Sequence, residues 1–372
     1  MEAAGFSQRL ELEEQQFVID SRFRTHNVNL AAYHTSYLRW AEWQVEAGLR
    51  IDFEHSRFIY QSEGLIHYHF TDNKSNNRPV HTNINGNIPL TYVEFIPRIA
   101  VSYNRPSWNV YASVAEGYKA GGFNNQLFSD IMQNQMMKDM MKDMGVYFVN
   151  STDYKVSEVI TYMPERCLTF EVGSHCLHSF ANDNTLQGEL TVYELEVFNQ
   201  QLTTFPKNGT GRLMTNAGHS RSIGTEATID YKYKNLNLNA SYGYTHATFV
   251  SYNNGKQELA GKYIPYAPQH TLSLGATYTF TFDHNVVHRL SLNVNTNALG
   301  PIYWDEDNTS RQDFYALLNA NIKLSMDYVT LQLWGKNLTN TTHDVFHFVS
   351  MNRHFMQAGK PIQFGATILV TI

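Results

Sequence analysis

The sequence has no run of apolar residues long enough to cross a membrane as a helix, which takes roughly 18 such residues. Its first residues, Met1 to Ala4, have neither the basic start nor the apolar core of a secretory signal peptide. Charged residues make up only 17% of the chain, which is low for a soluble protein. The net charge of −6 offers no electrostatic attraction to nucleic acid, so we expect no nucleic-acid partner.

Cysteine is also scarce, because the chain contains only Cys167 and Cys176. If both lie on one extended strand at about 3.3 Å per residue, they are roughly 30 Å apart. The Cα atoms of a disulfide lie within about 7 Å of each other, and the pair does not have the spacing of a zinc site. We therefore expect two incidental thiols that are neither bridged nor bound to metal.

The sequence is instead rich in uncharged polar residues and in aromatic residues, with 23 Tyr and 22 Phe. Hydrophobic residues make up 42% of the chain. A β-barrel that faces lipid on the outside and water on the inside needs this mixture. A large soluble β protein, such as a sandwich or a propeller, is compatible with the composition as well.

Strict alternation of apolar and polar residues indicates β-strands. In one segment Leu236, Leu238 and Ala240 alternate with Asn237 and Asn239, so that one face is apolar and the other polar. The same pattern recurs at 43–54, 271–280 and 290–295. Several such segments reach about 11 residues, the length of a membrane strand, whereas soluble strands average nearer five or six.

The predicted strands lie near 6–16, 26–38, 43–56, 91–103, 108–118, 166–177, 185–200, 222–233, 236–250, 268–281, 286–298, 312–325, 328–338 and 361–372. Their links alternate between short ones (39–42, 104–107, 234–235, 282–285 and 326–327) and long ones (57–90, 119–165, 251–267, 299–311 and 339–360). Short periplasmic turns that alternate with long external loops are typical of outer-membrane barrels.

The predicted fold is therefore all-β: an antiparallel transmembrane β-barrel of about fourteen strands, as one domain over residues 1–372. An even number of strands would start and end on the periplasmic side. In the segment 185–200 the alternation slips near Val192 and Tyr193, which indicates a bulge.

Motifs in a fixed order then point to a family. Residues 110–124 read VYASVAEGYKAGGFN and resemble the YASxxxGYKAGGFN stretch of TonB-dependent receptors for iron complexes. Residues 7–12 resemble the family's SQELRL strand. Further matches in the family's order are Tyr162-Met163-Pro164-Glu165, Phe170-Glu171-Val172-Gly173, Asn216-Ala217-Gly218, Gly224-Thr225-Glu226, residues 261–270, residues 335–340, Gly359-Lys360-Pro361 and Phe364-Gly365.

The resemblance covers nearly the whole chain, and the methionine-rich segment resembles that of receptors from Bacteroides-type bacteria. It implies a protein of the Gram-negative outer membrane, in contact with its lipid, from a family whose barrel has about 22 strands and an N-terminal plug. It also implies uptake of a ferric siderophore or similar chelate, with TonB acting only through the plug. We expect this chain to lack the plug, the TonB box, the signal peptide and about eight of those strands.

Two groups of residues are candidates for function. Glu46, Arg50, Asp52 and Glu54 alternate on the polar face of one predicted strand, so they would project into the lumen. In the family such residues hold the plug, and contact with the ligand is the alternative. The family's external loops bind ligand, which points to Tyr118, Lys119, Phe123 and Asn124, where a cation beside aromatic rings would suit an anionic iron chelate.

Other patterns give weaker hypotheses. His67 and His69 would share one strand face and could bind a metal or haem, although surface histidines are the simpler interpretation. The residues Met136-Met137, Met140-Met141 and Met144 lie three and four apart, which would place them on one face of a short helix. Thioethers can bind copper(I), but an apolar helix over the barrel mouth fits better. We find no motif for an enzyme, a cofactor or a metal centre in a supporting context.

Three functions remain open on the sequence. The first is the barrel portion of an active importer for a ferric chelate. The second is a truncated remnant or a passive plugless pore without active transport, which we expect to assemble poorly on its own. The third is a soluble β-rich binding protein, in which the apolar faces would pack against another sheet.

Overall fold

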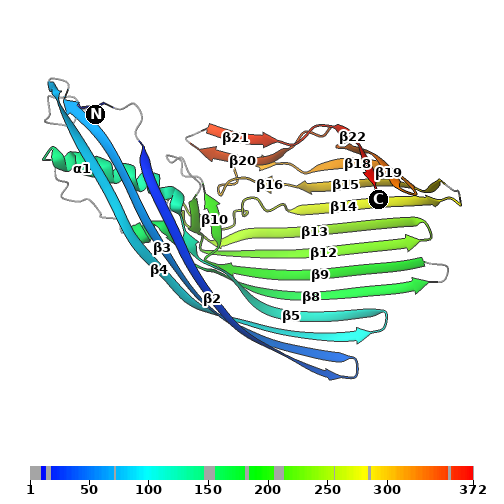
Figure 1. The fold of residues 1–372 in the computed structure, drawn as a ribbon. Helices are drawn as coiled ribbons and strands as arrows, with labels where there is room; N and C mark the ends of the chain where they lie inside the picture. The colour runs from blue at the N-terminus through cyan, green and yellow to red at the C-terminus, as the bar shows by residue number, and fades with distance from the viewer. Residues whose placement is uncertain are drawn as a thin grey trace.

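The computed structural model describes residues 10–13, 18–70, 73–145, 156–180, 184–204, 213–254, 256–283, 286–350 and 353–371. They form a strongly curved antiparallel sheet of 14 strands, with smaller elements at one end (Figure 1). The predicted all-β, antiparallel fold is confirmed. None of the described helices is both long enough and apolar enough to cross a membrane.

The main sheet consists of β1 (Leu10–Leu12), β2 (Ile19–Trp40), β3 (Trp43–Phe70), β4 (Asn73–Arg105), β5 (Trp108–Lys119), β8 (Glu165–Phe180), β9 (Asn184–Phe198), β12 (His219–Tyr233), β13 (Leu236–Ser251), β14 (His270–Thr281), β15 (Val287–Gly300), β18 (Tyr315–Met326), β19 (Val329–Lys336) and β22 (Gln363–Val370). The long external loops contain β6 (Gly122–Phe123) paired with β7 (Thr161–Tyr162), β10 (Gln201–Thr204) with β11 (Leu213–Asn216), β16 (Ile302–Tyr303) with β17 (Arg311–Gln312), β20 (Asp344–Ser350) with β21 (Arg353–Ala358), and the helices η1 (Asn125–Leu127), α1 (Phe128–Asp143) and α2 (Val156–Ile160).

One face of the sheet carries an apolar band. On β3 the exposed residues Leu49, Ile51 and Phe53 belong to it, and Val93 and Phe95 continue it on β4. Exposed apolar residues extend the same face across the other strands, namely Val172, Leu190, Val192, Ile229, Leu238, Leu274, Leu292, Val294, Ile322, Leu333 and Ile368. In an outer-membrane barrel such a band contacts lipid, so the opposite, mainly polar face lines the lumen.

Two strands continue far beyond this band. β3 has 28 residues and β4 has 33, whereas about 9–11 residues cross a membrane. Beyond Phe53 the outer face turns polar with His55 and Arg57, while the inner face turns apolar with Phe58 and Tyr60. The two strands therefore leave the lipid near Phe53 and stand in water as an external hairpin (residues 55–91). The sequence-based prediction of a loop at 57–90 is wrong.

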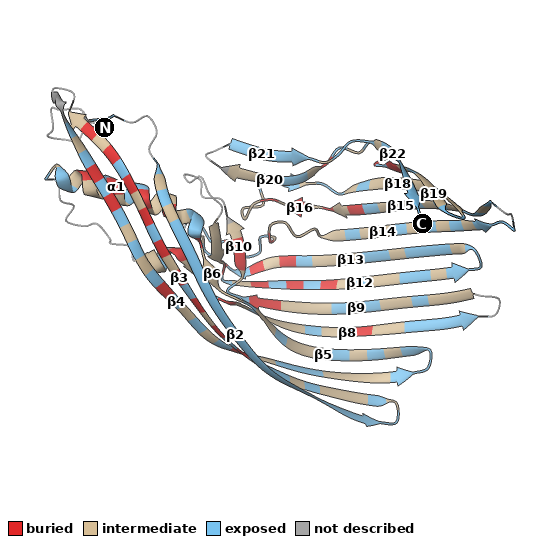
Figure 2. Cartoon of the chain, in the orientation of Figure 1, coloured by how far each residue is buried: buried red, intermediate tan, exposed pale blue. Residues whose placement is uncertain are grey.

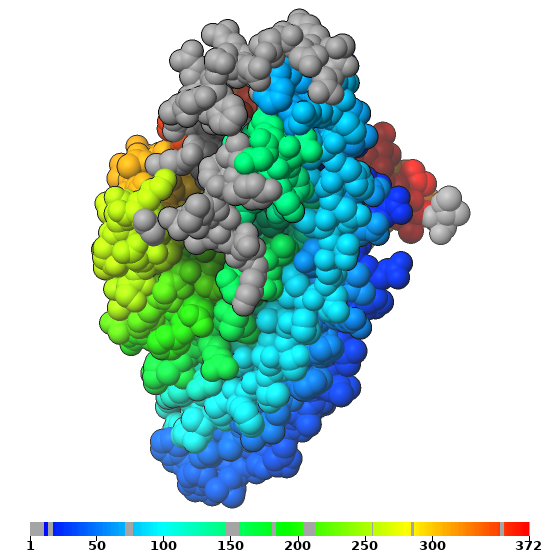
Figure 3. Space-filling view, turned by 90° about the vertical axis from the view of Figure 1, so that its left-hand side faces the viewer, coloured from blue at the N-terminus to red at the C-terminus, as the bar shows by residue number. Residues whose placement is uncertain are grey.

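Helix α1 covers the inner face of the external hairpin. Met132, Met136 and Met140 are all buried, because residues four apart share one face of a helix. Their face packs with apolar side chains of the hairpin, among them Ile66 and Val80. Figure 2 shows the buried residues of β3 and β4 concentrated beside α1, and Figure 3, seen from the loop end, shows the helix lying against the hairpin. The predicted helix is confirmed, but Met137 is exposed and does not share the buried methionine face.

Two carboxylates fix the position of α1 along the hairpin. Asp139 accepts a hydrogen bond from the hydroxyl of Thr82 at 2.7 Å. Asp143 accepts one from the hydroxyl of Tyr68 at 2.5 Å. Both donors are fully or almost fully buried, so these bonds satisfy polar groups that the helix would otherwise leave unpaired.

The first strand differs from its prediction. β1 and β2 lie along the same edge of β3, with Leu12 opposite Tyr68 and Ile19 opposite Gly64. β1 therefore extends this edge at the external end and does not cross the band, so the prediction of a spanning strand at 6–16 is wrong for residues 10–12. The rest of that range, apart from residue 13, lies outside the described residues. Because β2 runs toward a short turn, the described chain begins on the external side and not on the periplasmic side.

Two further expectations have opposite outcomes. β9 keeps one register with both of its neighbours, so the bulge expected near Val192 and Tyr193 is absent. A register shift occurs instead between His219 and Ser220, where β12 pairs with β13. Cys167 and Cys176 both lie on β8 as free thiols, as predicted.

Candidate functional site

A network of charged side chains occupies the inner face of β3, level with the external edge of the apolar band. Arg50 donates two hydrogen bonds to Asp52, from Nε at 2.7 Å and from Nη2 at 3.0 Å. The hydroxyl of Tyr118, at the end of β5, donates to the same carboxylate at 3.0 Å. Asp52 is only 2% exposed, and a buried carboxylate is stable only with such partners. These contacts hold Arg50 with half of its side chain exposed to the lumen.

The register partner of Asp52 on β4 is Glu94, which is also buried. Like charges on paired strand residues repel each other. Arg166 of β8 neutralises Glu94 through two contacts, Nε–Oε2 at 2.7 Å and Nη2–Oε1 at 3.1 Å. β4 pairs with β5 only over 98–105. Tyr118 and Arg166 therefore bridge the place where the external hairpin diverges from its neighbour.

The other two residues predicted to face the lumen lie on the same face of β3. Glu46 lies 3.8 Å from the Nε atom of Arg98, and Glu54 is buried. All of these side chains are opposite the lipid-facing side of the strand. The surface can therefore bind a polar partner inside the lumen, and contact with a plug stays a prediction.

The residues predicted to bind ligand have different surroundings. Lys119 has an exposed side chain at the end of β5, next to Tyr118. Phe123 stacks on Phe58 of the external hairpin, with ring centroids 4.9 Å apart. The structure thus brings Phe123 into packing contact with the hairpin and leaves Lys119 open to solvent. Their role in binding ligand stays a prediction.

The fourth of these residues, Asn124, belongs to a junction of external loops. Its side chain mimics a strand partner: Nδ2 donates to the carbonyl of Met214 at 2.8 Å, and Oδ1 accepts from the Met214 amide at 2.9 Å. Gln201 Nε2 donates to the carbonyls of Ala120 at 2.8 Å and Met163 at 3.1 Å. The sequence analysis missed Gln201, because nothing local distinguishes a loop amide that satisfies distant backbone groups.

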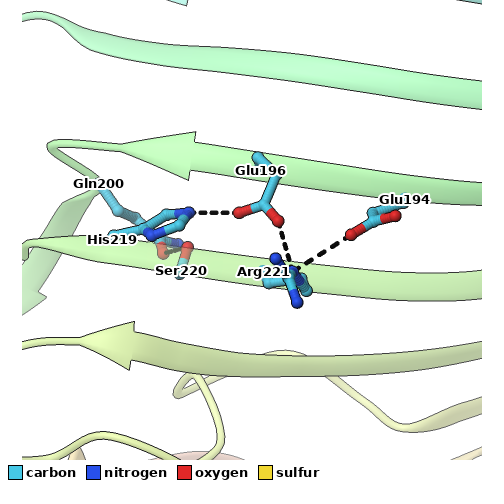
Figure 4. A network of polar contacts seen from close by, with 6 residues as sticks. All are labelled: Glu194, Glu196, Gln200, His219, Ser220 and Arg221. Atoms are coloured by element: carbon cyan, nitrogen blue, oxygen red, sulfur yellow. Dashed lines mark hydrogen bonds and ion pairs between the residues drawn. The ribbon is translucent and has the colours of Figure 1, made fainter.

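A second charged network lies on the outer face, just beyond the apolar band (Figure 4). Glu196 on β9 accepts hydrogen bonds from His219 and Arg221 on β12. The Nε atom of Arg221 also lies 3.2 Å from Glu194. Two residues further along β12, Ile223 is exposed and belongs to the apolar band. The network therefore ties β9 to β12 where both leave the lipid, at the ends of the loop that connects them.

Two external loops meet at Glu306. Its carboxyl accepts hydrogen bonds from the hydroxyl of Tyr252 at 3.2 Å and from the amide of Asn254 at 3.3 Å. Asn308 adds two bonds to the backbone of Tyr263, at 2.7 and 2.9 Å. Burial raises the pKa of Glu306 above its ordinary value, and the hydrogen bonds from Asn254 and Tyr252 offset this only in part. The loop contact therefore favours the neutral carboxyl.

This raised pKa predicts that the loop contact weakens as pH rises. A carboxyl whose folded-state pKa is raised contributes stability that is fully present below its unfolded-state pKa and is lost as pH passes the raised value. We expect residues 256–264 to open more often at neutral pH than in acid, as measured by hydrogen exchange corrected for the intrinsic rate at each pH. Glu306→Gln keeps a neutral acceptor and should abolish the dependence; an equal dependence in that variant would contradict the assignment.

The hypothesis that His67 and His69 bind a metal gains no support from the structure. His67 and His69 lie on the outer face of the external hairpin, and His69 is 3.4 Å from Glu11. Within the part of the chain that the structure describes, no group of three or more His, Cys, Asp or Glu is placed to hold a metal ion.

Comparison with known proteins identifies a family and solved structures that are similar to this chain. Residues 12–338 match the family model "TonB dependent receptor-like, beta-barrel". The ferric yersiniabactin uptake receptor FyuA from Yersinia pestis gives a TM-score of 0.66 at 18% identity, over 95% of this chain and 47% of its own. The ferric citrate transporter FecA gives a TM-score of 0.56 at 16% identity, over 97% of this chain and 57% of its own. The siderophore receptor PiuA from Acinetobacter baumannii gives a TM-score of 0.54 at 14% identity, over 88% of this chain and 43% of its own.

The chain thus spans about half the length of these solved structures. At such low identities the structural likeness shows a shared fold. The family model covers most of the sequence, from the last residue of β1 to just past the end of β19. The chain therefore belongs to the TonB-dependent receptor β-barrel family, and its place is the outer membrane of a Gram-negative bacterium.

Proposed function

We propose that this chain forms the barrel wall of a TonB-dependent receptor that takes up a ferric siderophore or a similar iron chelate. The family match over residues 12–338 is the observation that carries the proposal. The similar structures include uptake proteins for ferric yersiniabactin and ferric citrate. The ligand would be bound and moved without a chemical reaction, and TonB would act through a plug in the lumen.

The lumen face and the loops supply the groups that such a ligand needs. Iron chelates are commonly anionic and carry oxygen donors, and guanidinium groups bind oxyanions with a rigid pair of donors. Arg50 and Arg166 are held by buried carboxylates and keep about half or more of their side chains exposed. Lys119 adds an exposed charge at the end of β5, one residue after Tyr118. We propose that the ligand meets Tyr118 and Lys119, while Phe123 and Asn124 shape the loop beside them.

Uptake of iron tests the proposal. Cells with the native locus intact or deleted would be supplied with radioactive iron on a panel of catecholate, hydroxamate and carboxylate chelators. Loss of uptake for one chelate in the deletion strain, restored by the intact locus, supports the proposal. Unchanged uptake of every chelate would contradict it, and a change only in passive permeability to small solutes would favour the plugless pore.

Replacing Lys119 should weaken binding of an anionic chelate. Lys119→Met removes an exposed charge, and exposed ion pairs contribute about 0.2–1 kcal/mol, which corresponds to a change in affinity of roughly 1.4- to 5-fold. The difference from wild type should shrink as salt is added, because salt screens exposed charges. Binding of the chelate to cells that carry the native locus measures both effects. Lys142→Met, an exposed lysine on α1, is the matched control, and equal loss in both variants would contradict a specific role for Lys119.

A further inference from the structure

Five basic side chains gather on the outer face of the external hairpin and of β2, which pairs along it. This basic patch consists of Arg22, Arg24 and His26 on β2 and of His55 and Arg57 on β3. Arg57 is the register partner of His26, and Arg24 lies diagonally across from Arg57, at about 7–8 Å in such a sheet. All of these residues except the half-buried His55 are exposed, as is most of β2 (Figure 2).

No carboxylate lies within the basic patch to balance these charges. The outward-facing positions beside it on β3 and β4 are neutral, namely Ile59, Gln61, Asn85, Asn87, Pro89 and Thr91. Only at the far end of the patch does an acidic residue appear, where Asp20 lies 3.3 Å from Arg22. Like charges on neighbouring strand positions repel each other. An anion bound to the patch would relieve that repulsion.

Other arginines near the external edge of the apolar band are neutralised by the protein itself. Arg221 contacts Glu196 on the outer face (Figure 4), and Arg166 contacts Glu94. In the basic patch, by contrast, Arg57 Nε donates a hydrogen bond to the amide oxygen Oδ1 of Asn87 at 3.2 Å. This bond orients the guanidinium group without cancelling its charge. The basic patch thus offers positive charge that the neighbouring sites lack.

The basic patch lies directly above the apolar band, on the same face of the same strands. Phe53 and Leu30 are paired, exposed residues of the band, and Arg57 and His26 follow four residues further out on each strand. Four residues at about 3.3 Å each, on strands tilted by about 35–45°, rise roughly 10 Å. The headgroup region of a bilayer is about 5–8 Å thick on each side, and the flexible stem of arginine can reach back toward it.

We infer that the basic patch binds the phosphate of a glycolipid headgroup in the external leaflet, while the acyl chains of the same lipid lie on the apolar band. A guanidinium group matches the geometry of a phosphate with paired donors. Arg24 and Arg57 are close enough to contact one phosphate from two strands. The site is on the outer face of the sheet and not in the lumen, so it goes beyond the proposed uptake of iron, and either can fail without the other.

Lipid binding by the protein purified from its native outer membrane tests the inference. The double variant Arg24→Gln/Arg57→Gln removes two charges from the basic patch. The matched control, Arg311→Gln/Arg353→Gln, removes two exposed charges from β17 and β21. Each protein would be stripped of lipid in mild detergent and titrated with glycolipid extracted from the same membrane, either intact or treated with phosphatase. Native mass spectrometry counts the bound lipid.

The patch variant should bind the intact lipid roughly 30-fold more weakly than wild type, which is about 1 kcal/mol for each arginine. The control should bind it as wild type does, and wild type should bind the phosphatase-treated lipid more weakly. Equal affinity of the patch variant and wild type would overturn the inference, as would an equal loss in the control. Equal binding of the two lipid forms by wild type would overturn it even if a variant failed to reach the membrane.

Inorganic phosphate, titrated alone into the lipid-free wild type, separates the two sources of a phosphate group. It should bind far more weakly than the intact lipid, because it has no acyl chains to bury against the apolar band. Binding of inorganic phosphate as tight as that of the lipid would indicate a site for free phosphate and would overturn the assignment to a lipid. None of these readouts depends on binding or uptake of iron.

Discussion

Purified alone and reconstituted into lipid vesicles, this chain should form no closed, conducting barrel. Twelve antiparallel pairings join the thirteen strands from β2 to β22, so these two edge strands run in the same direction and could pair with each other only in parallel. Bacterial outer-membrane barrels are built from antiparallel strands. An open sheet would leave the free edge of β2 in hydrocarbon, at several kcal/mol for each unsatisfied group. A closed barrel resists denaturing detergent until it is heated, so it migrates differently on a gel before and after boiling. We expect one migration for heated and unheated samples, and no steady conductance across the vesicle membrane.

The matched comparison is the same chain extracted from its native outer membrane with mild detergent. If both edges of the sheet are paired there, the unheated sample should migrate as a compact barrel. If the chain purified alone were heat-modifiable and conducting, β2 and β22 would have to pair directly. That result would contradict this prediction.

The alternating segments could be predicted well because one face of each strand contacts lipid and the other contacts water. On β13, Leu238 faces lipid and Asn239 faces the lumen, so the polarity of each residue indicates which face of the sheet it lies on. The short turns could be predicted as well, since the predicted ones interrupt the alternation for only two to four residues. Ala41 and Lys234 in two of these turns adopt positive φ angles of 49°, which is typical of the turns that reverse a β-hairpin.

The external hairpin could not be predicted on the same grounds. The alternation continues past Phe53, but apolar residues such as Phe58 lie on the inner face and not on the outer face. The sequence-based assignment ended the strand where its apolar outer face ends. Beyond that point the strand lies in water, and its apolar inner face must be covered by another element of the structure. Helix α1 provides that cover, and only tertiary structure reveals it.

The charged network in the lumen was predicted on one strand only. Arg50, Asp52 and Glu54 follow the alternation of β3, so their common face was evident from spacing. Glu94 also occupies an inward position on its strand, yet its pairing with Arg166 spans 72 residues of sequence. No local pattern carries such a long-range contact, and the divergence of β4 from β5 that makes it possible is a property of the whole sheet.

Substituting leucine at Gly64 should detach α1 from the external hairpin. Gly64 faces the helix, and a Cβ atom there would lie 3.0 Å from the Met136 sulfur and 3.6 Å from the Met132 methyl group. Flexible thioethers could yield to a single methyl group, but a full leucine has no space. Overpacking costs about 1–3 kcal/mol, which corresponds to a rise of roughly 5- to 150-fold in helix opening at 1.4 kcal/mol per decade.

Tryptic cleavage of the folded protein in its native membrane reports this opening, because α1 carries Lys138 and Lys142. We expect cleavage after these lysines to accelerate in Gly64→Leu and to stay unchanged in Gly48→Leu. Gly48 lies on the same face of β3, but a Cβ atom there would have Thr35 Oγ1 as its nearest neighbour, at an ordinary 3.5 Å. Equal cleavage in the two variants would mean that α1 is not held by the methionine face. Faster cleavage only in Gly64→Leu would establish that the packing of Met132 and Met136 against Gly64 holds α1 on the external hairpin.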